Sequence, residues 1–590
     1  MGTQTDTVKT VEQLLDHGYK TSNTEKLFSD WNGSDWTTMS FNQYHEQVYQ
    51  LAWGIDQIGL ERGSRIAFFM DNNSSFCLAD LATTLAGHIS VPLHLTFGHS
   101  AIEFIVDHSE AKACIVSNAS QLVKISSSTD IQTFIIQQIS EHDRKKLPQQ
   151  LKVLSFDQLK TAEPKPLPIT KPEDTVTIIY TSGTTGQPKG VALSQSNLVE
   201  MNKMVCHDLR NGIHKNEREV SFLPLSHIFA KAAIYRWLWH GTSVYFTNHD
   251  QLMMHVAMVR PQMFSTVPHL LEKLFDYCSI MGESIEGMDK ELYKAAFEFA
   301  KSFDINTASE ADQQRKNAYE PIYQIWRKLF GGELNFVCSG GAALRPEICT
   351  LFKTAGIIIL EGYGMTEAPV VSINPYSNPR PGTTGLPFTG TEVKIDDDGE
   401  IIVRGPQVMN AYYKNEEATA RTIIDGWLHT GDIGIFDESG HLKITDRKKN
   451  VFKMSTGEFV MPQPLETALQ SNPIIANAIV IGEGQAYCSV LIFPEIDRLP
   501  KLAARMGIEC DDPALIMFSP PAQAFFQNTI DQANANMPRW SKIKRFLVLN
   551  ERITLENGLL TPTLKVRRKL ILEKFATQIK DMYHKNRDEK

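Results

Sequence analysis

Short apolar runs alternate with helix-length stretches along most of the chain. Ile66–Met70 is an unbroken apolar run, Ile89–Leu93 is rich in β-branched residues, and Phe76–Ala86 between them has helical character. An unbroken apolar run is typical of a parallel strand that is buried on both faces. Further strand-like runs that alternate with helical stretches are Ala113–Val116, Phe134–Ile136, Thr175–Tyr180, Ser243–Phe246, Phe264–Val267, Asn335–Cys338 and Ile357–Leu360. The pattern predicts an α/β fold built from βαβ units and mixed βα layers.

Two stretches predict helices of different kinds. Ser40–Leu60 carries apolar residues at helical spacing, and Ser40 with Gln43 forms a capping-box signal at its start. The stretch from Ser279 to Lys328 is charged and helix-prone, which predicts an inserted helical arm at the surface.

The length of the chain and a change in its predicted secondary structure indicate more than one domain. At 590 residues the chain exceeds what one hydrophobic core usually supports. Short strands and turns around the hairpin signal Asp398-Gly399 predict a small β-rich lobe. The charged segment TDRKKN is the candidate linker. We therefore expect a large N-terminal domain at 1–445, a hinge at 446–450 and a smaller α+β domain at 451–590.

Composition argues against several classes of protein. A net charge of −9 with a pI of about 6.0 disfavours a nucleic-acid binder, which needs a concentrated basic surface. The eight cysteines are scattered without the spacing of a zinc site or a disulfide framework, which favours reduced thiols and a cytoplasmic protein. No apolar run has the length of a membrane span, so any membrane contact would be peripheral.

The strongest local motif is YTSGTTGQPKGV, which follows an apolar strand. Small residues leave backbone N–H groups and hydroxyls free to surround phosphate oxygens, and a lysine adds positive charge. The spacing differs from that of a P-loop, which disfavours a P-loop NTPase. The candidate phosphate-binding residues are Thr181, Ser182, Gly183, Thr184, Thr185, Gly186 and Lys189.

This motif and those that follow it resemble the AMP-forming acyl-CoA synthetases, whose superfamily also contains luciferases and nonribosomal adenylation domains. The resemblance covers nearly the whole chain, because the family's motifs occur in the expected order. It implies ATP as substrate, magnesium as its counterion and an adenylating domain followed by a smaller mobile domain.

Two glycine-rich motifs resemble the family's adenine site. In EGYGMTE the resemblance implies that Tyr363 stacks on adenine, Thr366 contacts the α-phosphate and Glu367 holds magnesium. An aromatic face suits a purine, and a carboxylate suits magnesium. The resemblance also assigns to the nucleotide site the neighbouring residues Glu361, Gly362 and Gly364, and Gly340, Gly341 and Ala342 of SGGAAL.

The remaining motifs resemble the ribose site and the mobile domain. In GWLHTGD, Asp432 matches the acid that accepts both ribose hydroxyls, and in TDRKKN, Arg447 matches a ribose or phosphate ligand. Lys449 or its neighbour Lys448 matches the pivot of the mobile domain, and Gly457 lies in the segment that resembles the coenzyme A channel.

Two further residues are expected to act on the acyl group. In LTPTLKVRRKL, Lys565 matches the lysine that reaches the reacting carboxylate, and in FLPLSHIFA, His227 matches the residue that lines the acyl entrance.

The resemblance implies a ligase that joins a fatty acid, most closely a long-chain one, to coenzyme A through acyl-AMP. A medium-chain or unusual lipid acid stays open as the substrate. The alternatives are transfer of the acyl group to a carrier protein, a luciferase-like oxygenase and a catalytically silent lipid-binding scaffold. Retention of Lys189, Glu367, Asp432, Arg447 and Lys565 disfavours the scaffold, which would need none of them.

Overall fold

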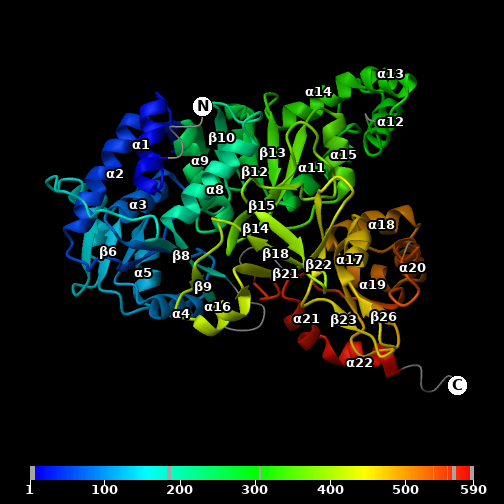
Figure 1. The fold of residues 1–590 in the computed structure, drawn as a ribbon. Coiled ribbons are helices and arrows are strands. Elements are labelled where there is room, and N and C mark those ends of the chain that lie inside the picture. Colours follow the sequence, from blue (N-terminus) through cyan, green and yellow to red (C-terminus); the bar gives the residue numbers. More distant parts are fainter. Residues whose placement is uncertain are drawn as a thin grey trace. The chain divides into compact units, whose positions relative to one another are not determined.

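The computed structural model describes residues 7–181, 188–304, 307–535, 537–554, 556–560 and 566–584. The chain divides into two compact units (Figure 1). Unit 1 comprises 1–394, 402–429 and 436–442, and unit 2 comprises 395–401, 430–435 and 443–590.

Unit 1 contains a nine-stranded sheet whose middle strands are parallel. The pairs from β1 through β11, β10, β12 and β13 to β14 are parallel, and antiparallel β2, β15 and β16 complete the two edges. Its strands in spatial order are β16 (Leu386–Pro387), β15 (Ala368–Ile373), β14 (Ile358–Met365), β13 (Phe336–Ser339), β12 (Met263–Thr266), β10 (Arg218–Ser221), β11 (Ser243–Phe246), β1 (Phe28–Trp31) and β2 (Trp36–Met39).

A second sheet of unit 1 has eight strands. Its parallel strand β5, with the sequence ACIV, is buried along its whole length, as its unbroken apolar run predicts. Its strands in spatial order are β19 (Ala411–Tyr412), β9 (Lys189–Ser194), β8 (Thr175–Thr181), β4 (Ile89–Pro92), β3 (Arg65–Phe69), β5 (Ala113–Val116), β6 (Thr133–Ile136) and β7 (Lys152–Ser155).

Helices connect the strands of unit 1, and several begin at local capping signals. The predicted capping box is confirmed at α2, where Gln43 N–H donates to Ser40 Oγ over 3.2 Å and Ser40 N–H donates to Gln43 Oε1 over 2.9 Å. The connecting helices are α1 (Val11–Thr21), α2 (Phe41–Asp56), α3 (Ser74–Leu85), α4 (His99–Ser109), α5 (Ala119–Ser126), α6 (Glu141–Arg144), α7 (Phe156–Leu159), α8 (Gln195–Asp208), α9 (Ile228–His240), α10 (Leu252–Val259), α11 (Pro268–Met281), α15 (Pro346–Thr354) and α16 (Glu416–Thr422).

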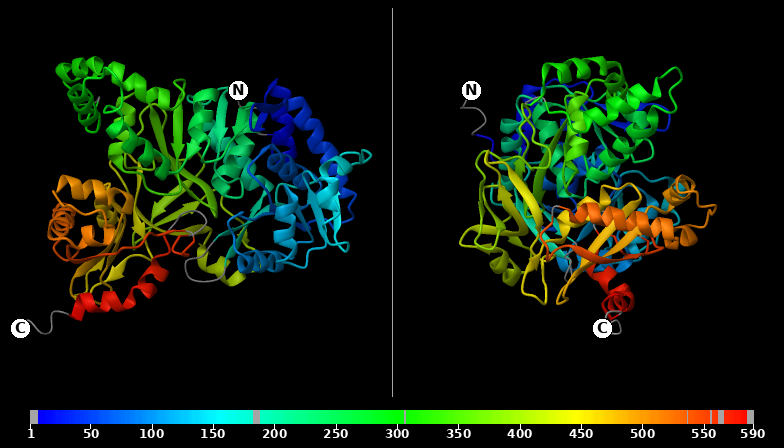
Figure 2. Two further views of the ribbon diagram at one scale, coloured as in Figure 1. Left: turned by 180° about the vertical axis from the view of Figure 1, so that it is seen from behind. Right: turned by 90° about the vertical axis from the view of Figure 1, so that its right-hand side faces the viewer.

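The expected helical arm consists of α12 (Lys290–Ala300), α13 (Glu310–Ala318) and α14 (Glu320–Leu329). Figures 1 and 2 show α12 and α13 at the periphery of unit 1, away from the eight-stranded sheet. The arm is more than a solvated surface feature, because Tyr293, Tyr323 and Trp326 are buried within it. The Trp326 indole N–H donates to the Tyr293 hydroxyl over 2.8 Å, so its indole nitrogen keeps a hydrogen bond inside this apolar cluster.

The predicted β-rich lobe is present as a small five-stranded sheet. At the predicted hairpin, Asp396 N–H donates to the Glu400 carbonyl over 2.8 Å, and Gly399 has a φ of +85°. The strands are β17 (Glu392–Ile395), β18 (Glu400–Arg404), β20 (Ile423–Ile424), β21 (Trp427–Phe436) and β22 (Leu442–Arg447).

The remainder of unit 2 is α+β, with a three-stranded sheet covered on both faces. Along β25 (Ile475–Ile481), Ala478 and Val480 join one apolar cluster, whereas Ile479 and Ile481 join another, because successive side chains point to opposite faces. Figure 1 shows α18–α20 on one side of this sheet and α21 and α22 on the other. The other elements are β26 (Cys488–Pro494), β27 (Ile543–Val548), β23 (Phe452–Lys453), β24 (Phe459–Val460), α17 (Pro462–Gln470), α18 (Leu499–Arg505), α19 (Pro513–Phe518), α20 (Pro520–Asn534), α21 (Arg568–Lys574) and α22 (Ala576–His584).

All eight cysteines are free thiols, and five of them are buried: Cys77, Cys114, Cys278, Cys349 and Cys488. Among the described residues, no helix combines the length and apolar character that crossing a bilayer requires.

Candidate active site

The carboxyl ends of three parallel strands bring two predicted motifs together in unit 1. Thr266 of β12 is in register with Ser339 of β13, which is in register with Glu361 of β14. SGGAAL begins at Ser339 and EGYGMTE begins at Glu361, so both lie at the same edge of the sheet. A Cβ atom at Gly340 would lie 3.6 Å from the Gly362 carbonyl oxygen, so the two motifs are direct neighbours.

Beyond this contact, the SGGAAL turn has free space around its backbone. Gly341 has a φ of +84°, which favours glycine, and a Cβ atom there would meet nothing within 4 Å. Gly341 and Ala342 are both exposed. The turn can therefore present its backbone to a flat ligand without a side chain in the way.

EGYGMTE forms a β-hairpin. The expected strand ended at Leu360, but β14 continues to Met365, which pairs with Ala368 of β15. Thr366 and Glu367 make the turn, and each is only 7% exposed. The turn therefore holds a hydroxyl and a carboxylate side by side in a largely desolvated position.

Close packing explains why the hairpin has a glycine at position 364. A Cβ atom at Gly364 would lie 2.2 Å from the Pro369 carbonyl oxygen, which no side chain could tolerate. The preceding Tyr363 is 9% exposed, so its ring is largely enclosed.

The ends of the phosphate-loop motif are fixed by strand pairing. Thr181 at the end of β8 faces Lys189 at the start of β9, and Thr181 Oγ1 donates to the Lys189 carbonyl over 3.5 Å. Five predicted phosphate ligands between them, Ser182, Gly183, Thr184, Thr185 and Gly186, lie outside the described residues.

Tyr412 connects this motif with EGYGMTE. Lys189 Nζ lies 4.7 Å from the centroid of the Tyr412 ring, and the Tyr412 hydroxyl donates to Glu367 Oε1 over 2.7 Å. A predicted phosphate ligand and the predicted metal ligand therefore contact the same aromatic side chain. Sequence reasoning missed Tyr412, and no local signal distinguishes it from the adjacent Tyr413.

The Glu361 side chain is directed into the protein. Its Oε1 accepts a hydrogen bond from Gly382 N–H over 2.9 Å and lies 3.4 Å from Cys349 Sγ. Burial raises the pKa of the Glu361 carboxyl to about 7 and raises the pKa of the Cys349 thiol well above its ordinary value. Near neutral pH, the protonated and the ionised forms of this carboxyl are therefore both populated.

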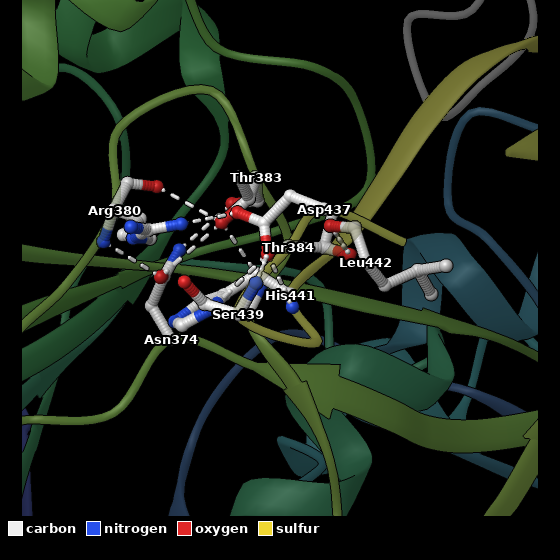
Figure 3. Close-up of polar contacts among 9 residues, drawn as sticks. Asn374, Arg380, Thr383, Thr384, Asp437, Ser439, His441 and Leu442 are labelled. Atoms are coloured by element: carbon white, nitrogen blue, oxygen red, sulfur yellow. Dashed lines mark hydrogen bonds and ion pairs between the residues drawn. The ribbon is translucent and has the colours of Figure 1, made fainter. Parts of the chain in front are cut away.

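Figure 3 shows the loop that carries Gly382 held against the turn between β21 and β22. Arg380 Nη1 forms an ion pair of 2.5 Å with Asp437 Oδ2, and Thr384 N–H donates to the Leu442 carbonyl over 2.8 Å. These bonds fix the loop that supplies the donor to Glu361.

His227 caps a helix beside the SGGAAL turn. Its Nδ1 accepts from Phe229 N–H over 3.3 Å at the start of α9, and the Phe229 ring would lie 3.4 Å from a Cβ atom at Gly340. The ring of His94 is stacked 6.3 Å from that of His227, and its Nδ1 lies 2.7 Å from Ser226 Oγ. Burial lowers the pKa of His94 to about 4, so His94 is neutral at neutral pH.

The predicted ribose ligands lie together in unit 2. Asp432 is 3% exposed, and its Oδ1 accepts from Arg447 Nε over 3.0 Å. Lys448 Nζ lies 2.8 Å from Glu400 Oε2 and 2.5 Å from Asp398 Oδ2, and these two hydrogen bonds raise the pKa of Lys448. The chain just after β22 is therefore tied by charge to the β17–β18 hairpin.

An open pocket of ≈ 390 Å³ adjoins these residues, and it is lined by Thr430, Gly431, Arg447, Lys448 and Lys449. Gly457 is not part of this lining. It lies in the turn between β23 and β24, with a φ of +101°.

Lys565 lies outside the described residues. On either side of the segment that contains it, Leu560 and Val566 form an antiparallel bridge, and both pack on the apolar cluster that α21 and α22 cover.

The described residues contain no group of three or more His, Cys, Asp or Glu side chains that could hold a metal ion. A single carboxylate such as Glu367 suits magnesium that arrives on the phosphates of a nucleotide, because protein-bound magnesium keeps several waters and few protein ligands.

Two family profiles match the chain. One described as AMP-binding enzyme matches residues 16–413, and one described as AMP-binding enzyme C-terminal domain matches residues 449–587.

Named relatives match along almost the whole length. A long-chain-fatty-acid–CoA ligase of Mycobacterium bovis is 31% identical over 575 residues, which cover 93% of this chain and 93% of that protein. The peroxisomal long chain acyl-CoA synthetase 6 of Arabidopsis thaliana is 30% identical and covers 94% of this chain, with 82% of its own length matched.

Solved structures share the fold. The adenylation domain of a carboxylate reductase from Mycobacterium chelonae superposes with a TM-score of 0.74 at 21% identity, covering 97% of this chain and 90% of that one. The o-succinylbenzoate CoA synthetase of Bacillus subtilis, in complex with its acyl-adenylate intermediate, superposes with a TM-score of 0.68 at 19% identity, covering 95% of this chain and 97% of that one.

Proposed function

The chain belongs to the AMP-binding enzyme family, and from this membership we propose that it forms fatty acyl-coenzyme A from a fatty acid, ATP and coenzyme A. The reaction passes through acyl-AMP and releases pyrophosphate and AMP. Relatives named as a long-chain-fatty-acid–CoA ligase and a long chain acyl-CoA synthetase, at 31% and 30% identity, support a long-chain fatty acid as the substrate.

The observation that carries the proposal is the contact of Lys189 and Glu367 with Tyr412. A cation and a carboxylate that share one neighbour suit a polyphosphate chain together with its divalent counterion.

The chemistry needs activation before transfer, because a carboxylate has an electron-rich carbonyl carbon and no adequate leaving group. In the first step a carboxylate oxygen attacks the α-phosphorus, a P–O bond to pyrophosphate breaks and acyl-AMP forms. In the second step the thiol sulfur of coenzyme A attacks the acyl carbon, AMP leaves and the thiol proton passes to solvent. Positioning and neutralisation of charge dominate catalysis of the first step.

In unit 1 we assign the phosphates to Thr181–Gly186 and Lys189, the α-phosphate to Thr366 and magnesium to Glu367. The adenine lies between Tyr363 and the backbone of the SGGAAL and EGYG segments, which is open at Gly341. His227 borders the acyl entrance.

In unit 2 we assign the ribose hydroxyls to Asp432, supported by Arg447 at 3.0 Å. Lys449 lies at the pivot, Gly457 in the coenzyme A channel, and Lys565 contacts the reacting carboxylate during adenylation only.

The test is a product assay by mass spectrometry. The protein is incubated with ATP, magnesium and saturated fatty acids of graded chain length, with either coenzyme A or a phosphopantetheine carrier protein as acceptor. We expect acyl-coenzyme A, AMP and pyrophosphate in equal amounts. Acylation of the carrier protein alone would favour the acyl-AMP ligase alternative, and no AMP with any acid would favour a silent scaffold.

A further inference from the structure

Tyr412 is held firmly between the two motifs that it contacts. It is 6% exposed and belongs to β19, where it pairs with Val191 of β9. The next N–H, that of Tyr413, donates to the Gly190 carbonyl over 2.7 Å. The backbone of Tyr412 is therefore attached to the strand that begins with Lys189.

The hydroxyl of Tyr412 fixes one oxygen of Glu367. It donates to Oε1 over 2.7 Å. The Glu367 carbonyl accepts from Met409 N–H over 2.8 Å, which also fixes the backbone. Within the described part of the chain, Oε2 has no hydrogen-bond partner, so it is the oxygen available to a metal ion.

The ring of Tyr412 faces Lys189. The distance of 4.7 Å between Nζ and the ring centroid lies within the range of a cation–π contact. A lysine side chain is flexible, and an aromatic face beside it limits the positions that its ammonium group samples.

We infer that Tyr412 is a positioning residue that aims Glu367 at magnesium through its hydroxyl and aims Lys189 at the phosphates through its ring. The inference rests on the proposed function, since it takes Glu367 as the metal ligand. Tyr412 itself touches neither the metal nor the phosphates. It acts by fixing the carboxylate and the ammonium group before ATP arrives, which lowers the ordering cost of binding.

The experiment compares ATP binding by calorimetry with magnesium and with EDTA. Tyr412→Phe removes only the hydroxyl, so we expect it to weaken binding of magnesium-ATP by about tenfold, the cost of losing one hydrogen bond to a charged group. Binding of metal-free ATP should not change. Tyr412→Leu also removes the ring, and it should weaken ATP binding in EDTA as well.

The adjacent Tyr413 supplies a matched control. Its ring contacts His108 and Arg65, and its hydroxyl makes no hydrogen bond with the described residues, so Tyr413→Phe should leave both affinities unchanged. A double-mutant cycle completes the test. If Tyr412 acts through Glu367, Tyr412→Phe should have no further effect on magnesium-ATP binding in a Glu367→Gln background.

The outcomes separate this inference from the proposed function. Additive losses in the cycle, or equal losses with magnesium and with EDTA for Tyr412→Phe, would overturn the role of Tyr412 while leaving the ligase intact. If the unmodified protein bound ATP equally well with and without magnesium, the metal role of Glu367 would be wrong, and the inference would fail with it.

Discussion

At the scale of single residues, buried ionisable groups beside the nucleotide motifs respond to pH in opposite directions. The pKa of Glu361 is raised from 4.5 to about 7, whereas that of His94 is lowered from 6.5 to about 4. The neutral form is favoured in both cases because each side chain is desolvated. Glu361 therefore stabilises the fold at acid pH and loses this contribution as pH rises, whereas His94 stabilises it above pH 6.5 and loses its contribution as pH falls.

Replacing Glu361 with Gln should change how stability depends on pH. Glu361 contributes fully below pH 4.5, and the contribution is lost as pH rises towards 7, a difference of about 3 kcal/mol. Gln does not titrate, so the unfolding free energy of Glu361→Gln, measured relative to that of the unmodified protein, should increase from pH 5 to pH 8, by about 3 kcal/mol at most. Urea unfolding at both pH values measures this, with exposed Glu438→Gln as control. Parallel stability curves would contradict the raised pKa.

Asp432 carries a prediction about the nucleotide. Asp432→Ala should weaken ATP binding by about tenfold or more, because hydrogen bonds to a charged acceptor are lost, without changing the preference for acyl length. The unmodified protein should bind 2′-deoxy-ATP more weakly than ATP, whereas Asp432→Ala should bind both alike. Exposed Asp397→Ala is the control. A variant that still discriminated against the deoxynucleotide would show that another residue binds the ribose.

At the scale of elements, close backbone packing decides the path of the loop that supports Glu361. Gly385 has a φ of +81°, and a Cβ atom there would lie 2.0 Å from the Ile373 carbonyl oxygen. Gly440, in the turn that the same loop contacts, has a φ of +78°, but its nearest neighbour would be 3.9 Å away. The two glycines share a backbone conformation and differ in the space around them.

These glycines separate backbone strain from steric overlap. Gly440→Ala should cost about 1–2 kcal/mol of unfolding free energy from its left-handed conformation alone. Gly385→Ala should cost more than about 3 kcal/mol, because the carbonyl of β15 must move as well. Urea unfolding followed by tryptophan fluorescence measures both. Equal losses would mean that the loop shifts freely and does not hold Glu361.

The sequence predicted correctly those elements that depend mainly on residues close together in the chain. The capping box at Ser40 and Gln43, the strand at Ala113–Val116 and the turn at Asp398-Gly399 all follow from neighbouring residues, and all are confirmed. The extension of β14 through EGYGM could not be predicted in this way, since two glycines disfavour a strand and pairing with β15 creates it.

In the candidate site, too, features set by neighbouring residues differ from features set by tertiary contacts. Motif order identified Lys189 and Glu367, but Tyr412 is defined only by its contacts with both, which are tertiary. The Cys349 thiol beside Glu361 likewise comes from a helix that no motif marks. The motifs therefore predict candidate ligand-binding groups, whereas the contacts of Tyr412 and Cys349 are tertiary and cannot be predicted from neighbouring residues.

At the scale of the whole molecule, the chain passes between its two compact units more than once. Segments 395–401 and 430–435 belong to unit 2, although the sequence around them belongs to unit 1. Asp432 and Arg447 lie in unit 2, whereas Lys189, Thr366 and Glu367 lie in unit 1.

The proposed contact of Lys565 with the carboxylate during adenylation only predicts unequal effects on the two half-reactions. Lys565→Ala should reduce acyl-AMP formation by at least about a hundredfold, because charge neutralisation at the carboxylate is lost. Thioester formation from supplied acyl-AMP should be nearly unchanged. Single-turnover assays of each step measure this, with Lys569→Ala as control, since Lys569 is 70% exposed and pairs with Glu573. Equal loss in both steps would exclude a role confined to adenylation.

The burial of Cys349 has a consequence for the fate of the intermediate. A mixed anhydride such as acyl-AMP acylates any thiolate that it meets, and Cys349 lies 3.4 Å from the first residue of EGYGMTE. Its side chain is sealed from solvent and its raised pKa keeps the sulfur protonated, so it is a poor nucleophile. A buried, protonated thiol of this kind reacts slowly with an activated acyl group, so we do not expect Cys349 to compete with coenzyme A for it.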